Sequence, residues 1–223
     1  MENFYQESGR AGRDNLPAKC ILLYKFSDIA RLSTMVFTEQ TGLEKLYGIV
    51  AYSLNNSSCR RKIIAEHFGE EWDSAQCSEM CDTCLSSKNA TNSLSLVNVS
   101  DIADAAIQIL VHAQSLDSKI TALKLIDALL GKGPSKISSW KKPPTNVCKK
   151  YQIEHVVANL LIDGHLKEDF HFTPYNTISY IVTGNVPVKS EIMLKIPSNS
   201  TTQQNKGVKR KKSPKIIDVS DSE

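Results

Sequence analysis

The sequence predicts a mixed, mainly helical fold in which small modules follow one another along the chain. Helical patterns of apolar residues recur at 28–35, 43–68 and 101–163, four cysteines cluster between positions 59 and 84, and the region beyond residue 190 is polar. With 223 residues, 41% of them hydrophobic, the chain can form one or two domains with apolar cores. A wholly disordered protein is therefore excluded.

The charge is unevenly distributed along the chain. The formal net charge is +3, but six of the 27 basic residues lie between positions 206 and 215, so the rest of the chain is close to neutral. No apolar run approaches the ~18 residues that a membrane-spanning helix needs, and residues 1–7 lack the basic and apolar regions of a secretion signal. We therefore expect no membrane association and a reducing compartment, where clustered cysteines more often bind metal than form disulfides.

Residues 1–35 predict only part of a domain. An apolar run at 20–24 is typical of a buried strand, and residues 28–35 have the pattern of a short helix. One strand and one helix cannot enclose a core. We therefore expect the end of a domain whose beginning is missing, with little stability of its own.

Residues 36–98 predict a helical module that binds a metal ion, followed by a Ser- and Asn-rich linker that begins at residue 86. Helices are expected at 43–54 and 59–68. The cysteines are Cys59, Cys77, Cys81 and Cys84, a C-x17-C-x3-C-x2-C pattern. Four thiolates complete a tetrahedral zinc site and leave no position for a substrate, so we predict one structural Zn2+. Incidental or disulfide-bonded cysteines are the alternative, and His67 is expected to be an ordinary surface residue of its helix.

Residues 99–190 predict three helices followed by a β-hairpin, which is the order of elements in a winged helix. The helical patterns occupy 102–113, 121–130 and 153–161, and the last two end at Gly131 and Gly164. Alternating residues at 166–172 and 178–182 predict two strands joined by a turn at 173–176. Beyond this module, residues 191–223 are expected to be a disordered basic tail.

Lysines gather around the second helix of this module. Thr121 and Lys124 open the helix, and Lys132 and Lys136 follow in the next loop. Because such groups contact phosphates without reading sequence, we predict that these four residues bind DNA. An ordinary solvated lysine face is the alternative.

A polar segment near the N-terminus, YQESGRAGRD at positions 5–14, carries two arginines that could reach one polyphosphate. Taken alone, it would be read as a solvated loop. It resembles the last conserved helicase motif of the RecQ family of superfamily 2 DNA helicases. In that family a zinc-binding domain and a winged helix follow in the same order, so the resemblance covers residues 1–183.

The resemblance implies domain limits and residue roles. Residues 1–35 would be a remnant of a RecA-like α/β lobe, 36–98 the zinc-binding domain with its linker, and 99–190 the winged helix. ATP would be contacted by Gln6, Gly9, Arg10 and Arg13, and the two arginines would act as catalytic residues at the γ-phosphate. Tyr175, at the tip of the hairpin, would stack on the last base pair and separate the strands. Without the resemblance, Tyr175 is an ordinary turn residue.

The sequence departs from the family in one respect. It contains neither a G-x-x-x-x-G-K-[ST] loop nor an Asp-Glu-x-His motif, both of which the ATPase needs. The resemblance therefore implies the C-terminal part of a 3′–5′ DNA helicase. Its complete form would use ATP and Mg2+ to unwind forked, partly single-stranded or junction duplexes in DNA repair, replication or recombination. This chain alone is expected to hydrolyse no ATP, and self-association as a homo-oligomer is left open.

Two other functions stay open on the sequence alone. One is a non-enzymatic regulator or a truncated dominant-negative form, which would read DNA through polar positions of the third helix, namely Gln152, His155, Asn159 and Asp163. The other is a scaffold whose zinc module contacts proteins. The basic segment KRKK at 209–212 is typical of a nuclear localisation signal, with a nonspecific polyelectrolyte as the alternative. We expect a nuclear protein.

Overall fold

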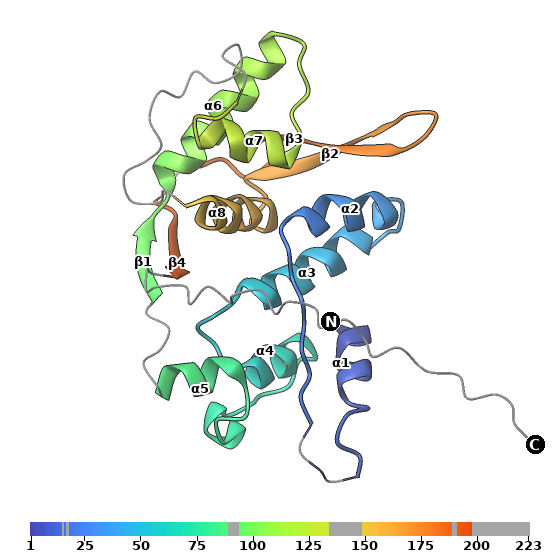
Figure 1. Cartoon of the computed structure of the whole chain (residues 1–223), viewed down its shortest axis with the longest axis vertical. Helices are drawn as coiled ribbons and strands as arrows, with labels where there is room; N and C mark the ends of the chain where they lie inside the picture. Colours follow the sequence, from blue (N-terminus) through green and yellow to red (C-terminus); the bar gives the residue numbers. More distant parts are fainter. Residues whose placement is uncertain (15, 17, 89–93, 134–148, 189–190, 198–223) are drawn as a thin grey trace, which may run out of the picture.

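The computed structural model describes residues 1–14, 16, 18–88, 94–133, 149–188 and 191–197. Over these residues the chain is mainly helical and has two small antiparallel sheets, which confirms the predicted mixed, mainly α class (Figure 1). No helix in this part of the chain is long and apolar enough to cross a bilayer. Lys136 and the basic segment at 209–212 lie outside the described residues.

The N-terminal segment contains no strand among its described residues. Helix α1 (Glu2–Ser8) is followed by turns and an irregular stretch that leads to α2 (Ser27–Val36). In that stretch Ile21 is 77% and Leu23 is 88% exposed. The predicted buried strand at 20–24 is therefore wrong, because a strand needs a hydrogen-bonded neighbour and no described strand lies beside this segment. The predicted helix at 28–35 is confirmed as α2.

Helices α2 and α3 (Gly42–Leu54) pack against each other. Gly42 opens α3 at a corner where an added Cβ would collide with the carbonyl of Val36, so the tight turn requires glycine. Beyond α3 lie α4 (Arg60–His67), the 3-10 helix η1 (Ser74–Cys77) and α5 (Asp82–Lys88), which form a small group of their own (Figure 1). The two helices predicted at 43–54 and 59–68 are thus α3 and α4.

The C-terminal part contains three helices and then a hairpin, in the order that the sequence predicts. The helices are α6 (Ser100–Ser115), α7 (Ala122–Leu129) and α8 (Lys150–Ile162), and the hairpin strands are β2 (Leu166–Phe172) and β3 (Thr177–Thr183). The apolar side chains of α7 do not all face the core. Leu123 is 44% exposed, whereas Leu125 is fully buried on the other face of α7.

A second, shorter sheet joins two segments that the sequence placed in a linker and in a disordered tail. Strand β1 (Leu94–Asn98) pairs antiparallel with β4 (Met193–Pro197), with Leu96 opposite Lys195. Residues 94–98 are therefore a strand rather than linker, and residues 193–197 a strand rather than disordered tail. Both strands are short and lie in polar regions, so their apolar residues did not form a recognisable strand pattern. One of these residues, Ile196 of β4, is buried.

One hydrophobic core unites elements that the sequence assigned to three modules. Phe26, Ile29, Leu46 and Val50, from the α2 and α3 region, belong to the same buried cluster as the inner faces of α6, α7 and α8. Helix α2 packs on β3, and α3 packs on α8. The predicted boundaries at 35 and 98 therefore do not separate independent cores. The hairpin runs alongside α2 (Figure 1).

Candidate metal centre

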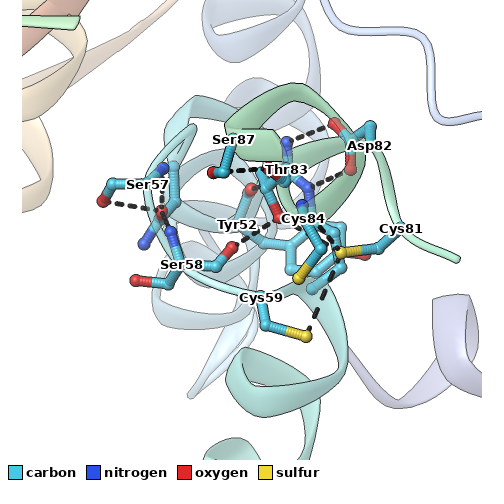
Figure 2. Close-up of polar contacts among 11 residues, drawn as sticks. Tyr52, Ser57, Ser58, Cys59, Cys81, Asp82, Thr83, Cys84 and Ser87 are labelled. Carbon is cyan, nitrogen blue, oxygen red and sulfur yellow. Dashed lines mark hydrogen bonds and ion pairs between the residues drawn. The ribbon is translucent and has the colours of Figure 1, made fainter. Parts of the chain in front are cut away.

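The four predicted metal ligands come together at one place. Cys59 precedes α4, Cys77 ends η1, Cys81 precedes α5 and Cys84 lies in the first turn of α5. Their sulfur atoms all lie within 4.8 Å of one another. Bonds of 2.3 Å to a tetrahedral Zn2+ would separate the sulfurs by about 3.8 Å, and the Sγ atoms of Cys59 and Cys81 are 3.9 Å apart (Figure 2). The cluster fits one zinc ion.

The chemistry of the donors favours a structural site. Cys59 and Cys77 are buried, and Cys81 and Cys84 are half-buried. All four are free thiols rather than disulfides. Four sulfur ligands saturate tetrahedral zinc, so no position is left for a water molecule or a substrate. The alternative of incidental or disulfide-bonded cysteines is thereby disfavoured.

The Cys81 thiol is prepared for ionisation. Burial opposes its charged form, but the hydrogen bond that it shares with the Thr83 hydroxyl and the one that it accepts from the Cys84 amide outweigh this effect and lower its pKa to about 6. The hydrogen bond with Cys81, together with burial, raises the pKa of Cys84. Burial raises the pKa of Cys77. A divalent cation is needed to hold several thiolates together.

A pairing that sequence reasoning missed, between Arg60 and Asp82, holds the two ligand-bearing helices together. Arg60 donates to both carboxylate oxygens of Asp82, at 2.9 and 3.0 Å, and to the carbonyl oxygen of Tyr52. Its guanidinium also lies 5.0 Å from the centre of the Tyr52 ring. Arg60 follows Cys59 and Asp82 follows Cys81, so this bidentate pair fixes the spacing of two ligands. The spacing of the cysteines by itself does not predict that Arg60 pairs with Asp82.

Removal of this pair is expected to loosen the metal centre without destroying it. Replacement of Asp82 by alanine should lower zinc affinity by roughly tenfold, as is typical when a group that orients metal ligands is lost. Competition with a chromophoric chelator measures this affinity. Glu66→Ala on α4 is the matched control, because Glu66 forms an exposed ion pair with Lys62 and contacts no ligand. Equal affinities for both variants would contradict the role of Asp82.

The arginine-bearing segment lies on the surface beside the metal module. Its helix α1 packs against α3 through Phe4 on Tyr52, at 5.3 Å between ring centres, and against the end of α4 through Tyr5 on Phe68, at 5.1 Å. Glu2 pairs with the side chain of His67 at 3.0 Å. A backbone hydrogen bond and this contact lower the pKa of Glu2 to about 2. His67 is thus a surface residue and no metal ligand.

The residues predicted to contact ATP are exposed. Gln6 lies on α1, and Gly9, Arg10 and Arg13 lie in the helix end and the turns that follow. Arg10 pairs with Glu7 at 3.3 Å. The four residues are neighbours, but the described residues include no phosphate-binding loop facing them, so their contacts with ATP stay predictions.

The residues predicted to bind DNA are divided between two places. Tyr175 is 98% exposed at the hairpin tip, where Thr173 and Asn176 close the turn. Thr121 caps the N-terminus of α7, and Lys124 is exposed in its first turn. Lys132 is exposed just after this helix, whereas Lys136 lies outside the described residues. These DNA contacts also stay predictions.

Comparison with known proteins supports the reading of the cysteine cluster. Residues 26–85 match the protein-family model described as RecQ zinc-binding, which takes in all four cysteines and also α2. ATP-dependent DNA helicase Q1 of Pongo abelii is 45% identical over 185 residues, or 82% of this chain and 28% of the relative. The protein of that name in Mus musculus is 46% identical over 186 residues, with coverages of 82% and 28%. ATP-dependent DNA helicase Q-like 2 of Arabidopsis thaliana is 38% identical over 213 residues, with coverages of 94% and 28%. The chain spans a little over a quarter of the length of these relatives.

Proposed function

The chain belongs to the RecQ family of DNA helicases, and on this premise we propose that it forms the zinc-binding and duplex-binding part of an ATP-dependent 3′–5′ DNA helicase. The observation that carries the proposal is the geometry of the hairpin. Its tip presents the exposed Tyr175, while its base packs into the same core as α2 and α3. The zinc ion would hold α4 and α5 together and take no part in the chemistry.

The C-terminal module would act as a winged helix that grips duplex DNA. Its support is the order of α6, α7, α8 and the hairpin, together with the exposed Lys124 and Lys132 around α7. Phosphate contacts from such lysines position a protein without reading sequence. An aromatic ring at a strand-separating tip can stack on the terminal base pair, which is worth ~1–3 kcal/mol per base and offsets part of the cost of unstacking.

In the complete helicase, Gln6, Gly9, Arg10 and Arg13 would face bound ATP, with Mg2+ held by other parts of the enzyme. Arginines in this role stabilise the charge that develops on the γ-phosphate. The sequence has no loop of the G-x-x-x-x-G-K-[ST] type, so the 223-residue chain alone should show no DNA-stimulated ATP hydrolysis. The basic segment at 209–212 would direct the protein to the nucleus.

Replacement of Tyr175 by alanine tests the proposal. In a helicase that contains this chain, unwinding of a forked duplex should fall by about tenfold, the equivalent of one lost stacking interaction. DNA-stimulated ATP hydrolysis should be unchanged, because the tip is remote in sequence from the arginine segment. Strand displacement and phosphate release are measured on the same preparation.

The matched control is Tyr151→Ala, since Tyr151 is an exposed tyrosine on α8 rather than on the hairpin. It should unwind DNA at the wild-type rate. Equal losses of ATP hydrolysis and unwinding in the Tyr175 variant would show that the residue is structural and would remove the proposed tip function.

A sequence-reading regulator is the less favoured alternative, because three of the four polar positions offered for base reading are engaged or withdrawn from solvent. Gln152 is buried and accepts a hydrogen bond from the Lys149 amide, and Asn159 donates to the carbonyl of His155. Burial lowers the pKa of His155, which keeps it neutral at physiological pH. Competition between forked and random duplex DNA separates the two functions, because a regulator would prefer one duplex sequence.

A further inference from the structure

A carboxylate on the hairpin accepts hydrogen bonds from three different elements. Glu168 of β2 receives the hydroxyl of Ser33 from α2 at 2.7 Å and that of Tyr47 from α3 at 2.8 Å. Ser179 of the paired strand β3 donates to the same carboxylate. We name these four residues the Glu168 cluster. It links the hairpin to both helices that precede the metal module.

The donors of the Glu168 cluster match the acceptor oxygens of its carboxylate. Ser33 is fully buried, and among the described residues the side chains that contact the Glu168 carboxylate are three hydroxyl groups rather than a cation. Burial, the nearby negative charge and the hydrogen bond to Glu168 raise the pKa of Tyr47, which keeps its hydroxyl protonated as a donor. Glu168 itself is half-buried, and a carboxylate withdrawn from water needs its acceptor sites filled, so its partners cannot shift without cost.

Aromatic contacts extend the attachment toward the tip. Residues two and four positions beyond Glu168 lie on the same face of β2. They are Phe170 and Phe172, and Phe37 at the end of α2 stacks on the first at 4.3 Å and tilts against the second at 5.6 Å between ring centres. One face of the hairpin is thus attached to α2 and α3 up to three residues before Tyr175.

We propose that Glu168 is a positioning residue that holds the hairpin tip at a fixed place relative to α2 and α3. The inference rests on the proposed strand-separating function of the tip. The segment that contains Arg10 and Arg13 leads along the chain into α2. The Glu168 cluster therefore connects the hairpin to the helix that follows the proposed ATP-binding residues. A wing attached on one face in this way meets the fork as a rigid element rather than as a flexible loop.

The test compares Glu168→Gln with Asp169→Asn in the zinc-loaded 223-residue chain. Both variants remove one negative charge from the same strand, but Asp169 is 53% exposed and faces Lys119 at 3.9 Å. Hydrogen exchange of the hairpin peptides and of α2, followed by mass spectrometry, reports the attachment directly. Glu168→Gln should accelerate exchange in both peptides by at least about tenfold, and Asp169→Asn should leave it unchanged. Unchanged exchange in the Glu168 variant overturns the inference.

A second readout reports the position of the tip on DNA. A photo-crosslinking phenylalanine analogue replaces Tyr175, and crosslinks to a forked duplex are mapped by nucleotide. With Glu168 intact, crosslinks should concentrate at the junction base pair. With Glu168→Gln they should spread over several nucleotides, at unchanged zinc content and with DNA affinity matching that of Asp169→Asn.

The two readouts separate failure of the inference from failure of the proposed function. Crosslinks absent from the junction with Glu168 intact would overturn the function of the tip, while the exchange data still decide whether Glu168 holds the hairpin. Focused crosslinks in the Glu168 variant would overturn the positioning function alone. Phe37→Leu weakens the aromatic part of the attachment and should reproduce the spread of crosslinks if Glu168→Gln proves unstable.

Discussion

Replacement of Cys81 by serine is expected to release the zinc ion and to unfold residues 59–88. Structural zinc sites contribute about 10–16 kcal/mol of apparent binding free energy, which is folding free energy for a module that cannot fold without metal. The metal module is such a case, because its buried residues are few, namely Cys59, Ala65, Cys77 and Thr83. A serine hydroxyl does not replace a thiolate ligand.

The unfolding should stop at α3. Leu46 and Val50 of this helix belong to the core shared with α6, α7 and α8, which does not depend on the metal. Mass spectrometry measures the zinc content, circular dichroism measures the loss of helix, and limited proteolysis shows how far the unfolding extends. Cys20→Ser is the matched control, since Cys20 is exposed and lies outside the cluster. Full zinc stoichiometry in the Cys81 variant would mean that the set of ligands is wrong.

Replacement of Leu125 by alanine is expected to destabilise the shared core by about 2–5 kcal/mol in the free energy of unfolding. The side chain is fully buried on α7, so its removal costs the transfer free energy and leaves a cavity. Since folded domains are stable by roughly 5–15 kcal/mol, this loss should lower the urea midpoint strongly. Because α2 and α3 share the core, their hydrogen exchange should rise together with that of α7.

The control for this experiment lies two residues away on the same helix. Leu123→Ala removes the same side chain from an exposed position and should change the free energy of unfolding by no more than about 0.5 kcal/mol. Similar destabilisation by both substitutions would mean that the loss comes from helix propensity or from another interface rather than from the buried core.

The metal ligands and most helices could be predicted because their signals are local. The cysteine spacing indicated the four thiols that cluster in the structure, and the apolar pattern at 153–161 indicated α8, where Ile153, Val156 and Leu160 are buried. The hairpin could be predicted from alternating residues on both sides of the turn at 173–176. Each of these signals lies within a few residues of the element that it specifies.

The errors and omissions concern contacts between distant segments. The apolar run at 20–24 looked like a strand, but a strand also needs a partner, and none is described beside it. Strands β1 and β4 pair across almost one hundred positions, so neither short segment carried enough pattern of its own. The partnership of Arg60 with Asp82 was missed for the same reason, because a single charged residue predicts no partner.

What the sequence determined by itself is which side chains can bind zinc, which stretches are helical, and where the hairpin turns. These properties arise from donor chemistry and from the periodicity of neighbouring residues, and they persist whatever the surroundings are. The tertiary structure alone decided that α2 and α3 share a core with the C-terminal module and that Glu168 is satisfied by hydroxyl groups from three elements. The physical reason is that a polar group or an apolar face does not specify its own partner. Which surface it contacts depends on the packing of the whole chain.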